Sequence, residues 1–133
     1  MIFIDTSAVV AILARERDAA GYAAKIAGAE KAIIAGHVLL EASMRLSSML
    51  GVDPEIASNA VLKLCNEADV EFQPIDRAVA ERAVSAFSRY GKGRGGKAQL
   101  NFGDCLSYAC ASVSNADLLF KGEDFLATDI RRA

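Results

Sequence analysis

The sequence predicts an α/β protein, a three-layer α/β/α sandwich with a central parallel sheet of four to five strands. Short, wholly apolar, β-prone runs alternate with longer segments that have the pattern of helices. This alternation is typical of a parallel sheet covered by helices on both faces. The chain has 133 residues, of which 53% are hydrophobic and 24% charged. We therefore expect residues 1–133 to form one domain with its own core.

The apolar runs at residues 1–4 and 32–35 are the clearest strands, because neither contains a polar residue that would face water. Residues 70–73 form a third candidate strand, which Pro74 ends. Residues 117–120 form the fourth. The carboxyl ends of parallel strands meet at one edge of a sheet, where open α/β proteins bind their ligands.

Helices are expected between these strands, and each has a recognisable start. Asp5-Thr6-Ser7 offers N-cap side chains for the first helix, with Thr6 and Ser7 as caps that leave Asp5 free. The third helix is apolar nearly all round, which predicts that it is buried. The expected helices span residues 6–15, 18–28, 36–50, 53–67, 76–90 and 103–114, and a glycine-rich basic loop spans 91–101.

Charge and cysteine usage restrict the setting of the protein. The net charge of −2 gives no overall attraction for nucleic acid, so a polyanionic partner needs a local basic patch or a metal ion. The cysteines (Cys65, Cys105 and Cys110) fit neither a zinc site nor a disulfide framework, so we expect small core residues in a reducing cytoplasm. The apolar run at 8–14 is too short to span a membrane and lacks the features of a leader peptide.

Four acidic residues are candidates for the functional site: Asp5, Glu41, Asp104 and Asp124. Asp5 follows the first strand, Glu41 lies on the helix after the second, and Asp124 comes shortly after the fourth. Asp104 opens the helix that leads into the fourth strand. Charges among apolar neighbours are costly unless something pairs with them. No lysine or arginine recurs beside all four, which favours a shared divalent cation.

Each acid also has a structural alternative. An acid at a helix start stabilises that helix, which would account for Asp5 and Asp104. Glu41 lies one turn from Arg45 and could pair with it. Asp124 lies in a polar segment typical of a surface turn.

Physical chemistry favours a metal if the four acids do converge. Carboxylates about 5 Å apart repel by roughly 3 kcal/mol per pair at an effective dielectric near 20. Several such pairs approach the total stability of a small domain, about 5–15 kcal/mol. Oxygen ligands favour Mg²⁺, with Mn²⁺ possible, over zinc. Asp117 and Asp129 compete with Asp124 for the fourth position, and the sequence does not rank them.

Four blocks of the chain resemble PIN-domain ribonucleases of the VapC toxin type. The resemblance is carried by Ile4-Asp5-Thr6-Ser7-Ala8, by Glu41 on its apolar helix, by the run at 100–105, and by the runs at 118–125 and 128–130. It implies a PIN-like fold and metal-dependent endonucleolytic cleavage of RNA, in which a cation activates a water for attack on phosphorus. It also implies a VapB-type antitoxin and a homodimer.

The resemblance places Asp5, Glu41, Asp104 and Asp124 on the family's acidic positions and Thr6 on its accompanying hydroxyl. The chain departs from the family where Gly122 stands, because many members carry another acid there. The alternative to a nuclease is a catalytically inactive PIN-like module that binds RNA or protein. Receiver and haloacid-dehalogenase phosphatase folds are disfavoured, because the paired acids they need are missing after the first strand.

The basic cluster is the candidate contact for RNA phosphates. It comprises Arg89, Lys92, Arg94 and Lys97, interleaved with glycines. Such a clamp would be electrostatic and mainly independent of base sequence. The alternative is a solvated loop. The single histidine, His37, begins the helix that carries Glu41, and we expect a helix-start or surface role for it.

Overall fold

The computed structural model describes residues 1–133 and contains a four-stranded parallel sheet with six helices. This confirms the predicted fold class. The strands lie in the order β3-β2-β1-β4, and every pairing is parallel. Their bounds are β1 Ile2–Ile4, β2 Ala32–Ala35, β3 Val70–Gln73 and β4 Asp117–Leu119.

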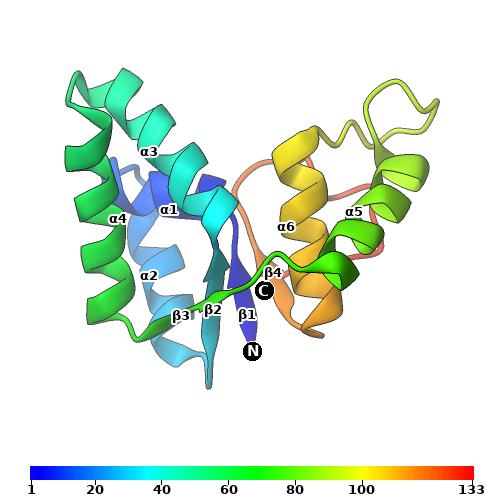
Figure 1. Ribbon diagram of the computed structural model, residues 1–133. Coiled ribbons are helices and arrows are strands. Elements are labelled where there is room, and N and C mark those ends of the chain that lie inside the picture. Colours follow the sequence, from blue (N-terminus) through cyan, green and yellow to red (C-terminus); the bar gives the residue numbers. More distant parts are fainter.

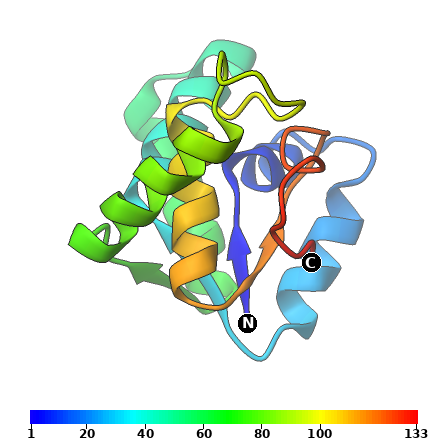
Figure 2. The same cartoon turned by 90° about the vertical axis from the view of Figure 1, so that its right-hand side faces the viewer.

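The helices form the two outer layers (Figures 1 and 2). α3 and α4 cover one face of the sheet, with α1 and α2 beside them, and α5 and α6 cover the other face. No helix combines the length and hydropathy that crossing a bilayer requires. The bounds are α1 Thr6–Leu13, α2 Ala19–Gly28, α3 Gly36–Leu50, α4 Pro54–Glu67, α5 Arg77–Tyr90 and α6 Phe102–Val113.

The register of the sheet fixes which residues share an edge. Ile4 pairs with Leu119 at the carboxyl ends of β1 and β4, and the Asp5 backbone N–H donates to the Leu119 carbonyl at 3.0 Å. Ile2 pairs with Asp117 at the opposite, amino-terminal ends. Asp5 and the segment after β4 therefore emerge side by side at one edge of the sheet.

The core fills the space between the sheet and both helix layers. Its largest fully buried side chains include Phe3, Ile34, Leu46 and Phe120. Strands with both faces covered carry apolar residues at every position, which is why β1 and β2 have no polar side chain. All three cysteines are buried free thiols, as expected of small core residues.

Two expectations about the helices are wrong. α1 ends at Leu13 rather than near Arg15, because Arg15 adopts a left-handed conformation (φ 54°) that turns the chain. α3 is not buried all round. Its exposed apolar side chains are Leu40, Met44, Met49 and Leu50. An exposed apolar stripe of this kind is typical of a surface that another molecule covers.

Candidate active site

Asp5 both caps α1 and lies at the carboxyl edge of β1. Its Oδ2 accepts hydrogen bonds from the Ser7 backbone N–H (3.0 Å) and from the Ser7 hydroxyl (2.6 Å). Of the alternative caps that the sequence offered, Asp5 is therefore the one that the helix uses. The carboxylate has no cationic partner although the residue is only 5% exposed. Because both hydrogen bonds go to Oδ2, Oδ1 is left for another ligand.

The segment after β4 is tied to Asp5 through Ser7. The Lys121 backbone N–H donates to Ser7 Oγ at 2.9 Å, and that hydroxyl donates in turn to Asp5. The Lys121 side chain pairs with Glu16 and with Asp18, the latter at 3.0 Å. These contacts hold the polar segment that carries Asp124 against the turn between α1 and α2.

Glu41 points toward the start of α6. Its Oε1 accepts a hydrogen bond from the Thr6 hydroxyl at 3.0 Å, and it makes no ion pair with Arg45. A Cβ on Gly103 would lie 2.5 Å from Glu41 Oε1, so only glycine leaves room for this carboxylate. Burial raises the pKa of Glu41 and the charge of Asp5 adds to this effect, against the Thr6 hydrogen bond.

Asp104 caps its own helix while facing the other acids. It forms a capping box with Asn101, in which the Asn101 N–H donates to Asp104 Oδ2 (3.1 Å) and the Asp104 N–H donates to Asn101 Oδ1 (2.9 Å). Burial raises the pKa of Asp104 to about 6, opposed by the Asn101 N–H and reinforced by the charges of Asp5, Asp124 and Glu41. The charges of the other three candidate acids therefore all act on Asp104.

The three candidates for the fourth acid lie in different surroundings. Asp117 is at the amino-terminal end of β4, in an ion pair at the far edge of the sheet. Asp129 pairs with Arg89 at 3.5 Å. Asp124 makes no ion pair, and its charge raises the pKa of Asp104. Of the three candidates, Asp124 is thus the one whose charge acts on Asp104.

The departure at Gly122 has a backbone explanation. Gly122 has φ 96°, a conformation that side-chain-bearing residues rarely adopt. An acid at this position would be strained in the turn that this chain forms.

The acids are neighbours without being in metal-ligand geometry. No three acidic, histidine or cysteine side chains are close enough to hold one metal ion. None of the four candidate acids takes part in an ion pair.

His37 lies at a helix start, as one of the two expectations had it, but not on the surface. It is half-buried in the first turn of α3. Its Nε2 is hydrogen-bonded to Ser107 Oγ at 2.9 Å, and its ring stacks on Phe3 at 6.1 Å between centroids. Burial lowers the pKa of His37 to about 4, against the charge of Asp5, so the ring is neutral at pH 7. Nothing in the sequence pattern singled out Ser107 as its partner.

The basic cluster divides into two parts. Arg89 is engaged by Asp129, which weakens its candidacy as a phosphate contact. Lys92, Arg94 and Lys97 are exposed in the loop between α5 and α6 and make no ion pair. These three charges are available to an anionic partner.

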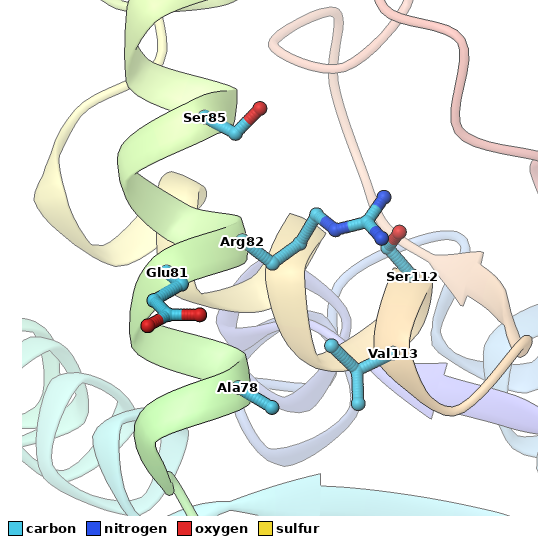
Figure 3. A pocket seen from close by; sticks show the side chains of 6 residues that line it. All are labelled: Ala78, Glu81, Arg82, Ser85, Ser112 and Val113. Atoms are coloured by element: carbon cyan, nitrogen blue, oxygen red, sulfur yellow. The ribbon is translucent and has the colours of Figure 1, made fainter.

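Two pockets bear on where a ligand binds. One, of about 320 Å³, adjoins the acids between α3 and the start of α6, and its lining includes His37, Glu41, Asn101, Phe102 and Gly103. A larger one, of about 580 Å³, lies on the outer side of α5 and α6 and contains none of the candidate acids (Figure 3). Its lining is Ala78, Glu81, Arg82, Ser85, Ser112 and Val113. Of these two pockets, only the first is lined by a candidate acid, Glu41.

Unpaired carboxylates at the carboxyl edge of the parallel sheet give this α/β protein an acidic site where open sheets bind their ligands. A PIN-domain family model matches residues 2–131. Ribonuclease VapC28 of Mycobacterium tuberculosis is 42% identical over 132 residues, covering 99% of this chain and 97% of the relative. Ribonuclease VapC of Mycolicibacterium smegmatis is 40% identical, with 96% and 95% covered. The chain belongs to the PIN-domain family and, within it, to the VapC ribonucleases.

Solved structures share the fold. VapC20 of Mycobacterium tuberculosis, described as a toxin that cleaves the sarcin–ricin loop, aligns with a TM-score of 0.78 and 19% identity, covering 100% of this chain and 98% of that one. VapBC2 of Rickettsia felis, bound to a promoter DNA fragment, aligns with a TM-score of 0.73 and 16% identity over the same shares. At these identities the likeness establishes the fold alone.

Proposed function

We propose that this protein is a metal-dependent endoribonuclease that acts as the toxin of a toxin–antitoxin pair. The observation that carries the proposal is the carboxyl of Asp104, held among Asp5, Glu41 and Asp124 with no cationic side chain to neutralise them. Family membership supports the reaction class, because the relatives over the full chain are named as ribonucleases.

The residues present fit a hard divalent cation, Mg²⁺ or Mn²⁺. All the donors are carboxylate oxygens, which these ions prefer. Gly103 leaves open the space beside Glu41 that a Cβ would fill, so the carboxylate reaches the start of α6. We assign Asp5 and Asp104 as the principal metal ligands, with Glu41 and Asp124 completing the site. Such a cation supplies an activated water and stabilises charge on the leaving oxygen.

The chain's own residues prepare this site before substrate arrives. Asp5 and Asp104 are each fixed by a helix cap. In each residue the cap uses one carboxylate oxygen, and the other oxygen accepts none of the hydrogen bonds described above. The Thr6 hydroxyl orients Glu41 toward α6. Side chains held in place in this way lose little further freedom when they bind the ion. Asp124 closes the site from the segment after β4.

RNA binding is assigned to the site and to the neighbouring loop. Lys92, Arg94 and Lys97 offer charges for phosphates on the same side as the start of α6. Arg89 contributes less, because it is paired. Contacts of this kind set affinity and its salt dependence rather than base preference.

Two protein partners belong to the proposal. Structural neighbours include a toxin–antitoxin complex from Klebsiella pneumoniae (TM-score 0.69, 18% identity) and VapBC2. We propose a VapB-type antitoxin whose segment lies over the acidic crevice and places an arginine near the carboxylates. We also propose a homodimer, supported by large apolar side chains left exposed on α3, α5 and α6: Leu40, Met44, Val84, Phe87 and Phe102.

The test compares cleavage of a mixed RNA pool in Mg²⁺, in EDTA, and by the Asp5→Asn variant. Cleavage in Mg²⁺ alone, lost with chelator and in the variant, supports the metal-dependent nuclease. Cleavage that is indifferent to EDTA would refute the role of the cation. RNA binding without cleavage in any divalent ion would instead favour the alternative, a catalytically inactive PIN-like module.

A further inference from the structure

One hydrogen bond joins the two helices that carry Glu41 and Asp104. His37 on α3 is bonded through Nε2 to Ser107 Oγ on α6 at 2.9 Å. His37 precedes Glu41 by four residues, and Ser107 follows Asp104 by three. Residues three or four apart lie on the same helix face, one turn from each other. The bond therefore lies one turn from each acid, on the faces where α3 and α6 approach one another (Figure 1).

Both partners of this bond are held in place by their surroundings. Ser107 is completely buried. The His37 ring lies nearly parallel to Phe3 of β1, with an interplanar angle of 8°. His37 Nδ1 is buried without a hydrogen-bond partner. A buried nitrogen without a partner costs stability, and the bond through Nε2 satisfies the buried Ser107 hydroxyl.

Each acid is already fixed relative to its own neighbours. The Thr6 hydroxyl orients Glu41, and the capping box orients Asp104. The remaining variable is the distance between α3 and α6, because the two acids sit on different helices. The His37–Ser107 hydrogen bond spans the space between these helices one turn away from both acids.

We propose that His37 and Ser107 form a positioning latch that sets the gap between Glu41 and Asp104 and thereby the affinity for the divalent cation. The inference rests on the proposed function, since it assumes that these acids hold the ion. The latch touches neither substrate nor metal. Its neutral ring adds no positive charge beside the cation site. Groups that orient metal ligands commonly affect metal affinity by about 10–100-fold when they are removed.

The test is the binding of Mn²⁺ to the full chain without RNA, by isothermal titration and electron paramagnetic resonance. Ser107→Ala and His37→Leu each remove the bond, and we expect each to weaken Mn²⁺ binding by about tenfold. His37→Gln places an amide nitrogen where Nε2 stands and should recover affinity to within about twofold. Ser107→Ala and His37→Leu should change the metal concentration that gives the half-maximal cleavage rate more than they change the cleavage rate at saturating metal.

The matched control is Ser43→Ala. Ser43 is also buried on α3, but its hydroxyl donates only to the Leu39 carbonyl of its own helix. This control should leave Mn²⁺ affinity unchanged. The double variant of His37 and Ser107 should lose no more affinity than either single variant, because one bond is removed in all three.

The latch is refuted if Ser107→Ala changes Mn²⁺ affinity no more than Ser43→Ala, or if the losses of the two latch variants add. Loss of thermal stability with unchanged Mn²⁺ affinity would also refute it, since that is the signature of a packing role. The nuclease proposal fails separately, if wild-type protein binds Mn²⁺ yet cleaves no RNA. If the latch prediction fails while cleavage is intact, the nuclease proposal still holds.

Discussion

Asp104→Asn should stabilise the metal-free protein at neutral pH while it abolishes RNA cleavage. The pKa of Asp104 is raised to about 6 by burial and by the neighbouring acids. The folded protein therefore resists ionising this carboxyl, and the charged form destabilises the fold. Asparagine removes the charge and keeps an oxygen that can accept the Asn101 N–H, so the helix cap survives.

The magnitude follows from the difference between the folded pKa and the ordinary value of 3.8. Two units correspond to about 3 kcal/mol at 1.36 kcal/mol per unit, and solvent screening at this half-buried carboxyl reduces the expected effect to about 1–2 kcal/mol. Between about pH 4 and pH 6 the folded state binds more protons than the unfolded state, so the stability of the wild-type protein falls as pH rises. The loss is complete above about pH 6. For a chain of this size we expect the variant to melt about 5 °C higher.

The assay is thermal and urea unfolding in EDTA, followed across the acid and neutral range. Asp53→Asn is the matched control, because Asp53 caps α4 by accepting from the Glu55 N–H and is exposed, away from the acids. Added Mg²⁺ should raise the melting temperature of the wild-type protein more than that of Asp104→Asn. The reasoning is refuted if metal-free Asp104→Asn is no more stable than wild type near neutral pH, or if the gap does not shrink as pH falls toward 4.

Two further predictions separate stability from function. Gly103→Ala should fold at least as well as wild type, because alanine favours helix. Its Cβ would displace the Glu41 carboxylate, so we expect RNA cleavage to fall by about 10–100-fold. The control is Gly21→Ala, because nothing lies within 4 Å of a Cβ at that position. It should gain about 0.5–1 kcal/mol of stability in urea unfolding and keep its cleavage rate. Equal cleavage rates for the two variants would contradict the close approach of Gly103 to the Glu41 carboxylate. Joint substitution of Lys92 and Arg94 by alanine should weaken RNA binding and lower the salt slope of log affinity by about 1.4, measured by fluorescence anisotropy; an unchanged slope would exclude the loop from the interface.

The strands were predictable because their signal is local, whereas their order in the sheet depends on contacts between distant residues. β1 and β2 are short apolar runs, and the position of Asp5 after β1 follows from the chain itself. The exposure of Leu40 and Met44 was not predictable, because an apolar side chain facing water has the same sequence pattern as one facing a core. The His37–Ser107 bond joins residues 70 positions apart, and no periodicity reports such a contact.

Asp5 and Asp104 each have two roles, in helix capping and in catalysis, and this affects which substitutions relatives with this fold accept. Each aspartate stabilises a helix with one oxygen, so replacement by alanine would damage folding as well as chemistry. Asparagine keeps the oxygen that caps the helix but loses the carboxylate that catalysis needs. Relatives that have drifted into pseudoenzymes should therefore carry asparagine at these two places more often than any other substitute. Asparagine at both positions would identify a relative that keeps the fold but no longer catalyses the reaction.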